Sequence, residues 1–296
     1  MTAAANTRIA IIGAGPMEHQ FRATIDRIPT AEIGLFVAEF DERLDTAAGR
    51  FDAVLIAGKS PNPNQLAGLG KPVWLSDRSL ISISPTVAAF AATPENLVIA
   101  TPLRFRSDIA AVKESLDSGQ LGGPGLLRIH CWRQPDGGAH RCLLDEIDLA
   151  CWFFGARPAS VYALSRSIHS TDDYIQVHFG FPAGGMAMID VNTSLPPGDS
   201  YRSLSLIGST GAAYADDHHN MQLIYQGDHP SAIRTDGADT ARLAELAAFV
   251  DSTRATGRSL ADIDFWQGTV VLANAVEASM NSGQACQRVG ERYELN

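Results

Sequence analysis

The sequence predicts an α/β protein of two domains, a doubly wound parallel sheet followed by an α+β domain with an open, mostly antiparallel sheet. Short apolar runs alternate with helix-compatible stretches over the first hundred residues. Strand-like runs separated by tight turns dominate the second half. A length of 296 residues, 45% of them hydrophobic, is enough for two buried cores. We place the domains at 1–106 and 107–296.

The first domain is predicted from five short apolar runs. The first of them ends in a glycine, as expected for a strand that is buried on both faces and leads into a turn. Helix-compatible stretches separate most of the runs, which indicates right-handed crossovers and therefore a parallel sheet. The five runs lie at 8–13, 33–38, 53–57, 73–75 and 97–100.

The second domain is predicted to combine helices with antiparallel strands. Helical spacing places Ile109, Val112 and Leu116 on one face, and a second helix is expected from about 143 to 154. The runs "YIQVHFGF" and "GMAMIDVN" flank the turn "PAG", and "YRSLSLIG" meets "GAAYADD" across "ST", as in antiparallel hairpins. Two further helices are expected to close the chain, through Leu243, Leu246 and Val250 and through Leu272, Val276 and Met280.

Charge and cysteine usage narrow the class of protein. The formal charge of -10 repels phosphate backbones and anionic lipid, so we expect neither nucleic acid nor a membrane as a partner. No apolar run reaches the roughly 18 residues of a membrane span. The four cysteines form no CxxC pair, which favours reduced thiols in the cytoplasm and argues against a metal site built on cysteine.

The segment "IAIIGAGPME" carries the first two glycines of a dinucleotide fingerprint, Gly13 and Gly15. Glycines there let the backbone turn and approach a pyrophosphate at a helix N-terminus. Glu18 stands where the third glycine belongs, so either its side chain swings outward or the cofactor is held weakly. An acid to bind the ribose is expected about 20 residues on, where Glu39 or Asp41 fits and would favour NAD over NADP.

Five segments, in order along the chain, resemble the Gfo/Idh/MocA oxidoreductase family. "RIAIIGAG" is similar to the family's first strand and turn, and "GKPVWLSDRSL" to the strand that leads into its Glu-Lys-Pro motif. "LRFRSDIAAVKESLDSGQLG" is similar to its domain-crossing segment. "GGAHRCLLDEIDLACWFFG" resembles its helix with Ile-Asp-Leu and Trp, and "LIGSTGAAYADD" a recurrent turn of its C-terminal sheet.

The resemblance implies a Rossmann domain, an open C-terminal sheet that makes homodimers or homotetramers, and NAD(P)-dependent hydride transfer on a small polar metabolite. NAD is the expected cofactor, with NADP possible, bound by Gly13, Gly15, Pro16, Met17 and Glu39. The match also implies an atypical site. Asp77 falls where the family has its catalytic lysine and Asp145 where it has its histidine, while Asp148 matches the family's aspartate.

The resemblance implies that Asp77, Asp145 and Asp148 lie near one cleft and that His140 could replace the missing proton carrier. Like charges in such a cleft raise the pKa of at least one carboxyl, which gives an acid beside a base. Structural alternatives remain open, because Asp148 could hydrogen-bond a neighbouring basic side chain and acids near a helix start favour the helix dipole. The alternative function is a family member without hydride transfer, either a non-redox acid-base enzyme (elimination, epimerisation, hydrolysis) or a catalytically silent binding or assembly subunit.

Overall fold

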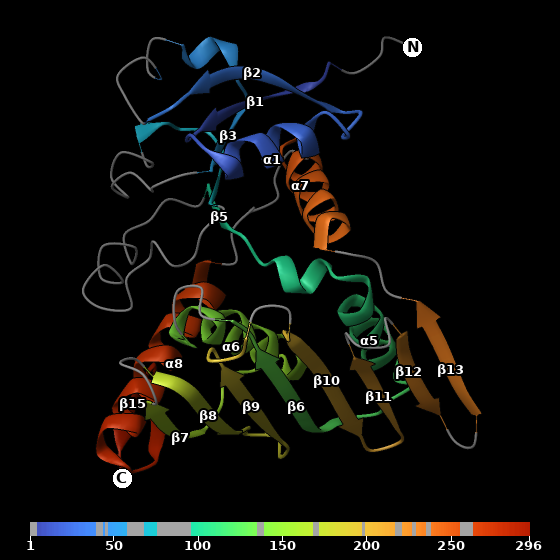
Figure 1. The fold of residues 1–296 in the computed structure, drawn as a ribbon, viewed down its shortest axis with the longest axis vertical. Helices are drawn as coiled ribbons and strands as arrows, with labels where there is room; N and C mark the ends of the chain where they lie inside the picture. The colour runs from blue at the N-terminus through green and yellow to red at the C-terminus, as the bar shows by residue number, and fades with distance from the viewer. Residues whose placement is uncertain are drawn as a thin grey trace. The chain divides into compact units, whose positions relative to one another are not determined.

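The computed structural model describes residues 5–39, 44, 47–57, 68–75, 96–134, 139–167, 172–196, 199–216, 221–226, 229–234, 238–254 and 263–296 (Figure 1). The chain divides into two compact units. Unit 1 comprises Met1–Pro102 and Ala238–Gln267, and unit 2 comprises Leu103–Gly237 and Gly268–Asn296. Each unit has its own sheet.

Unit 1 contains a parallel five-stranded sheet in the order β2-β1-β3-β4-β5. The chain leaves β1 for β2 on one side and returns to β3 on the other, so a topological switch point lies between β1 and β3. This confirms the predicted doubly wound sheet. The strands are β1 (Thr7–Ile12), β2 (Ala31–Val37), β3 (Ala53–Ile56), β4 (Val73–Leu75) and β5 (Leu97–Ile99).

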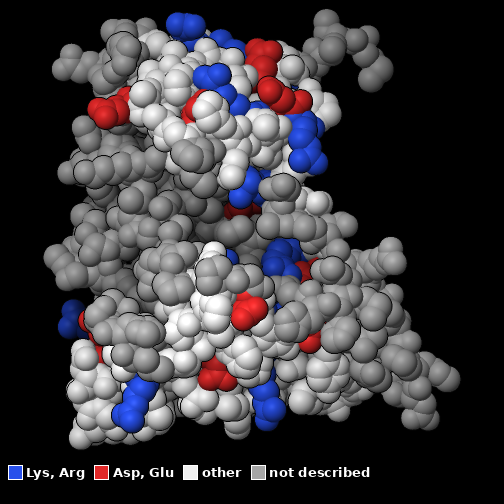
Figure 2. Space-filling view, in the orientation of Figure 1, with Lys and Arg blue, Asp and Glu red and all other residues white. Residues whose placement is uncertain are grey.

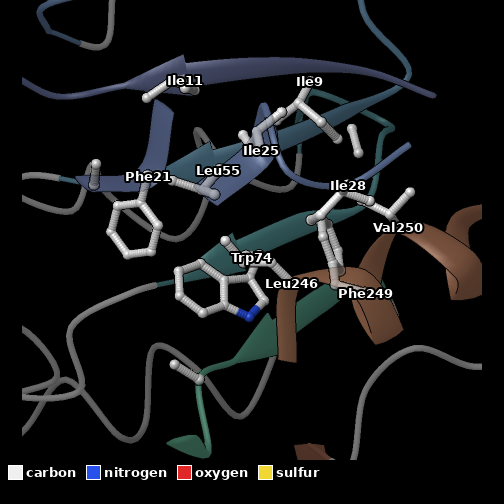
Figure 3. Close-up of a cluster of buried hydrophobic side chains, with 13 residues drawn as sticks. Ile9, Ile11, Phe21, Ile25, Ile28, Leu55, Trp74, Leu246, Phe249 and Val250 are labelled. Carbon is white, nitrogen blue, oxygen red and sulfur yellow. The ribbon is translucent and has the colours of Figure 1, made fainter. Parts of the chain in front are cut away.

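The core of unit 1 is built from the sheet and two helices, α1 (Pro16–Ile25) and α7 (Ala238–Arg254) (Figure 3). The rings of Phe21 from α1 and Trp74 from β4 meet edge to face, with 5.3 Å between their centroids. Phe249 on α7 is 4% exposed and packs into the same cluster. Short 3-10 turns lie at Ala48–Arg50 and Pro102–Phe105.

Helix α7 lies far from the rest of unit 1 in the sequence, and the sequence alone assigns it to the second domain. In the structure it contacts α1 and β1 and supplies Leu246, Phe249 and Val250 to their core. The buried Glu245 carboxylate also accepts a hydrogen bond from the backbone N–H of Thr101, at 2.5 Å. The apolar side of α7 is therefore buried against unit 1.

Unit 2 contains a ten-stranded sheet in the order β13-β12-β11-β10-β6-β9-β8-β7-β14-β15. Only the pairing of β6 with β9 is parallel among the pairings that the described residues make in this sheet. Both predicted hairpins, β8–β9 and β10–β11, are confirmed. The strands are β6 (Pro124–Trp132), β7 (Ser160–Ser167), β8 (Asp172–Gly180), β9 (Met186–Asn192), β10 (Tyr201–Gly208), β11 (Gly211–Asp216), β12 (Met221–Gln226), β13 (His229–Arg234), β14 (Cys286–Val289) and β15 (Arg292–Leu295).

Three helices pack on one face of this sheet, α5 (Ser107–Asp117), α6 (Ala139–Phe154) and α8 (Ile263–Ser282) (Figure 1). Helix α6 contacts β6, β8 and β9, and α5 contacts β11 and β12. On α8, the Ser279 hydroxyl accepts a hydrogen bond from the Ala163 N–H of β7. The predicted helices are thus confirmed, although α6 begins four residues earlier than expected.

The opposite face of the unit 2 sheet exposes large apolar side chains. Strand alternation points them away from the helices, because their neighbours along each strand are buried on the helix side. The exposed fractions are high for apolar groups, as for Leu164 at 47%. The set comprises Trp132, Tyr162, Leu164, Met186, Ile207 and Tyr214.

Charge is mixed over the surface that Figure 2 displays. On that face, the described lysine and arginine side chains stand among aspartate and glutamate side chains rather than in one large basic patch. Among the described residues, no helix is long and apolar enough to cross a membrane.

Candidate functional site

The glycine turn of unit 1 follows β1 at the switch point of the sheet. Strand register aligns the carboxyl ends of three strands here, because Ile12 pairs with both Val37 and Ile56. Gly13 follows at a φ of 140°, and its N–H donates to the Val37 carbonyl at 3.0 Å. Open α/β sheets bind ligands at this edge, beside the switch point.

Gly15 is the N-cap of α1 and provides no side chain over the first turn of the helix. Its backbone φ of 99° is one that residues with a side chain rarely adopt. A Cβ at this position would nevertheless meet no atom within 4 Å. Pro16 and Met17 begin the helix, and their side chains lie outside the described residues. The glycine turn therefore adds no side chain of its own at the helix N-terminus, as binding of an anion by the backbone N–H groups requires.

The sequence leaves two alternatives at position 18, an outward Glu18 side chain or a weakly held cofactor. The structure shows that the side chain does not swing outward. The residue is 5% exposed, and its carboxylate forms an ion pair with Arg22 one turn along α1. A second cationic partner, if protonated, is His19, whose Nδ1 lies 3.5 Å from Glu18 Oε2. The negative charge at the third glycine position is thus balanced within the helix.

Glu39 lies two residues after the end of β2 and is exposed. The end of β2 is tied to the glycine turn by the hydrogen bond from Gly13 to Val37. The alternative acid, Asp41, lies outside the described residues. Glu39 is therefore the described acid at the place where a ribose is expected.

In unit 2, Asp148 lies on α6 and is held by Arg104. The Arg104 Nε and Nη2 atoms donate to the two carboxylate oxygens at 3.0 and 2.9 Å. The side chains are 4% exposed for Asp148 and 15% for Arg104. The arginine carbon Cζ also lies 5.5 Å from the centre of the Trp152 ring. Asp148 thus forms the hydrogen bonds to a basic side chain that the sequence leaves open as the alternative to a catalytic role.

Two further arginine–carboxylate pairs lie in the same unit. Arg202 on β10 binds Glu146 on α6 through two hydrogen bonds of 3.2 and 2.8 Å, and both side chains are buried. Burial lowers the pKa of Arg202, but the charge and hydrogen bonds of Glu146 outweigh it and raise that pKa. Arg106 binds Asp108 at 3.1 and 2.8 Å. No local sequence pattern indicates the pairing of Arg104 or Arg202. The partner of Arg104 lies 44 residues away in the sequence, and the partner of Arg202 lies 56 residues away.

A pocket of about 320 Å³ opens in unit 2 between α6 and the ends of β6 and β10. Asp145 lines this pocket, whereas Asp148 does not. The structure therefore separates these two predicted site residues, although they lie one turn apart on α6. The other two, Asp77 and the side chain of His140, lie outside the described residues. The lining residues are Leu103, Arg106, Cys131, Trp132, Arg133, Gln134, Cys142, Asp145, Glu146, Ser200, Tyr201 and Arg202.

Comparison with known proteins finds one family model that matches part of the chain. Residues 109–214 match the model of the GFO/IDH/MocA C-terminal domain. A search of curated proteins by sequence finds no match. This match supports the resemblance to the Gfo/Idh/MocA family for the second half of the chain.

Several solved structures share the fold over nearly the whole chain. A myo-inositol dehydrogenase from Corynebacterium glutamicum is 20% identical, with 96% of this chain and 99% of that chain covered and a TM-score of 0.78. A probable dehydrogenase from Thermotoga maritima is 18% identical, with 94% and 98% covered and a TM-score of 0.78. An oxidoreductase from Agrobacterium radiobacter, solved with NAD+, L-tartaric acid and magnesium, is 16% identical, with 96% and 98% covered and a TM-score of 0.80.

The Asp108 ion pair predicts an acid-sensitive contribution to stability. Burial raises the pKa of Asp108, but the hydrogen bonds and charge of Arg106, with the Ile109 N–H, outweigh it and lower that pKa below its usual value. A depressed carboxyl pKa stabilises the fold above the unfolded-state value of about 4 and loses this effect as pH falls through the folded-state value. We expect Asp108→Asn to lower the free energy of unfolding by about 1–3 kcal/mol at neutral pH. Below about pH 4, the stability of this variant should fall less steeply than that of the unmodified chain.

Urea unfolding followed by circular dichroism at several pH values measures both effects. Asp117→Asn is the matched control on the same helix, because its side chain is 60% exposed and pairs with Lys113 at the surface. If the free energy of unfolding of Asp108→Asn falls with pH as steeply as that of the unmodified chain, the Arg106–Asp108 ion pair does not cause the predicted loss of stability in acid.

Proposed function

We propose that this chain, a Gfo/Idh/MocA family protein by its C-terminal domain and its fold, is an NAD(P)-dependent oxidoreductase that acts on a small polar metabolite. The observation that carries the proposal is the glycine turn at the switch point of unit 1, with the charge of Glu18 balanced by Arg22. Solved proteins of the same fold include myo-inositol dehydrogenases and proteins in complex with NAD. The substrate class is a hydroxyl- or imine-bearing compound.

The residues of unit 1 fit a dinucleotide. Gly13 and Gly15 let the backbone approach a pyrophosphate, the first turn of α1 offers N–H donors, and Glu39 would accept hydrogen bonds from ribose hydroxyls. When bound, NAD supplies a nicotinamide that accepts or returns a hydride. A carboxylate at position 39 repels a 2′-phosphate, which is why we propose NAD as the preferred cofactor.

The proton chemistry is proposed for Asp145, which lines the unit 2 pocket with Arg106 and Arg133. A carboxylate there can take a proton from a substrate hydroxyl and return it. Asp148, bound by two hydrogen bonds to Arg104, is proposed as a positioning residue for α6. Asp77 and His140 stay candidate proton carriers by the family match alone.

One observation favours the alternative function without hydride transfer. The carboxylate that matches the family's aspartate is buried and committed to Arg104 in the described structure. A protein that uses its acids in ion pairs could keep the fold as a binding or assembly subunit, or do non-redox acid-base work. Cofactor binding and turnover separate these possibilities.

We also propose that the chain forms homodimers or homotetramers through the open face of the unit 2 sheet. Its exposed Trp132, Tyr162, Leu164 and Met186 are apolar or aromatic side chains of the kind enriched where protein surfaces meet. A second copy would bury this set.

Cofactor binding is tested by titrating the purified chain with NADH and NADPH while following tryptophan fluorescence. We expect saturable binding with preference for NADH. Glu39→Gln should weaken NADH binding by about tenfold or more, the effect of losing hydrogen bonds to a charged acceptor. Glu32→Gln, a change at an exposed acid within β2, is the control. Absence of binding at millimolar cofactor would favour the silent subunit.

Turnover is tested by screening polyols and related hydroxyl compounds with NAD and following NADH formation. With a substrate in hand, we expect Asp145→Asn to lower kcat by about 10²–10⁴-fold, as for loss of a general base. Asp117→Asn, a change at an exposed aspartate on α5, should leave kcat unchanged. Unchanged kcat and pH profile in Asp145→Asn would remove Asp145 from the proton transfer.

Assembly is tested by light scattering after size-exclusion chromatography. We expect an oligomer that Leu164→Glu dissociates, because a charge would be buried in the apolar contact. Leu295→Glu is the matched control, since Leu295 is 48% exposed but lies opposite Cys286, on the helix side of the sheet. A monomer at every concentration, or equal effects of the two changes, would contradict the proposed interface.

A further inference from the structure

Two cysteines meet in the unit 2 pocket, and none of the proposed roles uses them. Cys131 on β6 is 3% exposed and Cys142 on α6 is 4% exposed. A side-chain hydrogen bond with Cys142 is the largest cause of the raised pKa of Cys131, and neither cysteine forms a disulfide. Both residues line the 320 Å³ pocket, so a small solute that enters the pocket reaches them.

Neighbouring contacts hold the two elements that carry these thiols together. Arg202 lies opposite Cys131 in the β6–β10 register, and Glu146 follows Cys142 by one turn of α6. The two hydrogen bonds from Arg202 to Glu146 therefore tie the same helix turn to the same part of the sheet. The thiol pair lies beside a rigid ion pair, which restricts how far α6 can move from β6.

A third group donates a hydrogen bond to one of the two sulfurs. Arg133 Nη1 donates to Cys142 Sγ at 3.7 Å. A guanidinium beside a sulfur stabilises the thiolate, which is the reactive form of cysteine. The charge of Arg133 also lowers the pKa of Cys131, but the hydrogen bond with Cys142, burial and the charge of Glu146 outweigh it. Cys142 is therefore the sulfur whose thiolate receives the hydrogen bond from Arg133.

We propose that Cys131 and Cys142 are a redox-active pair that forms a reversible disulfide when the protein meets a hydroperoxide. The inference goes beyond the proposed oxidoreductase function and does not depend on it. Among the described residues, no group of three or more His, Cys, Asp or Glu side chains could hold a metal ion, so the geometry points to oxidation rather than metal binding.

The chemistry balances with hydrogen peroxide as the oxidant. The Cys142 thiolate attacks one peroxide oxygen, the O–O bond breaks, and the departing hydroxide takes a proton to become water. Cys142 is then a sulfenic acid. Cys131 attacks its sulfur, the S–S bond forms, the S–O bond breaks, and a second water leaves. The two thiols lose two electrons, and the peroxide gains them.

The electrostatics assign Cys131 to the second step. The hydrogen bond with Cys142, followed by burial, raises the pKa of Cys131 well above its usual range, so it is a protonated donor in the resting pair. Conversion of Cys142 to a neutral sulfenic acid removes that cause. The other two thiols lie outside the pocket: burial raises the pKa of Cys151 to about 12, and Cys286 donates to the Ala275 carbonyl at 3.4 Å.

The test exposes the reduced full chain to hydrogen peroxide, blocks remaining thiols by alkylation and maps peptides without reduction. We expect two of the four thiols to be lost, with one peptide pair joined through Cys131 and Cys142 and restored by a dithiol reductant. Cys131→Ala should instead accumulate a sulfenic acid on Cys142, trapped by dimedone. Cys142→Ala should give neither product, and Cys286→Ala, the matched buried control, should behave as the unmodified chain.

Circular dichroism checks that each variant is folded, and the rates in the unmodified chain supply a readout that needs no variant. Cys142 should be oxidised at least about tenfold faster than Cys151 or Cys286 in the folded protein. A cross-link between two molecules, a bond to Cys151 or Cys286, or equal rates at all four thiols would overturn the proposal. So would lasting sulfenic acid on Cys142 while Cys131 is present.

Discussion

Helix α6 is held in unit 2 by two arginine–carboxylate pairs whose carboxylates are buried, and the candidate site depends on where they place the helix. Asp148 binds Arg104 and Glu146 binds Arg202, each through two hydrogen bonds. Removing one partner from such a pair costs about 3–5 kcal/mol, because a charge is left buried without compensation. The pairs thus determine the helix position from which Asp145 and Cys142 reach the pocket.

Unit 1 solves a related electrostatic problem at the glycine turn. An acid at the third glycine position would repel a pyrophosphate if its charge were unopposed. The guanidinium of Arg22, one turn away on the same helix, opposes the charge of the buried Glu18 carboxylate. Gly15 keeps the backbone conformation that the turn needs, which is the feature on which the proposed dinucleotide site rests.

The strands and hairpins could be predicted because their signals are local. Strand β9 alternates buried and partly exposed residues, and the "PAG" turn sets its pairing with β8 within a few residues. The packing of helix α7 could not be predicted from local sequence patterns. Leu246, Phe249 and Val250 predict an apolar face, but the same face would suit either sheet, and contact with β1 and α1 decides its partner.

The sequence by itself determined the order of elements, the glycine turn and the family resemblance, since each depends on residues within one short segment. Only the tertiary structure decided which charges meet. Arg104 and Asp148 are 44 residues apart, Arg202 and Glu146 are 56 apart, and their pairing follows from the packing of α6 on the sheet. Hydrogen bonds of this kind act over about 3 Å, a distance that spacing along the chain does not reveal.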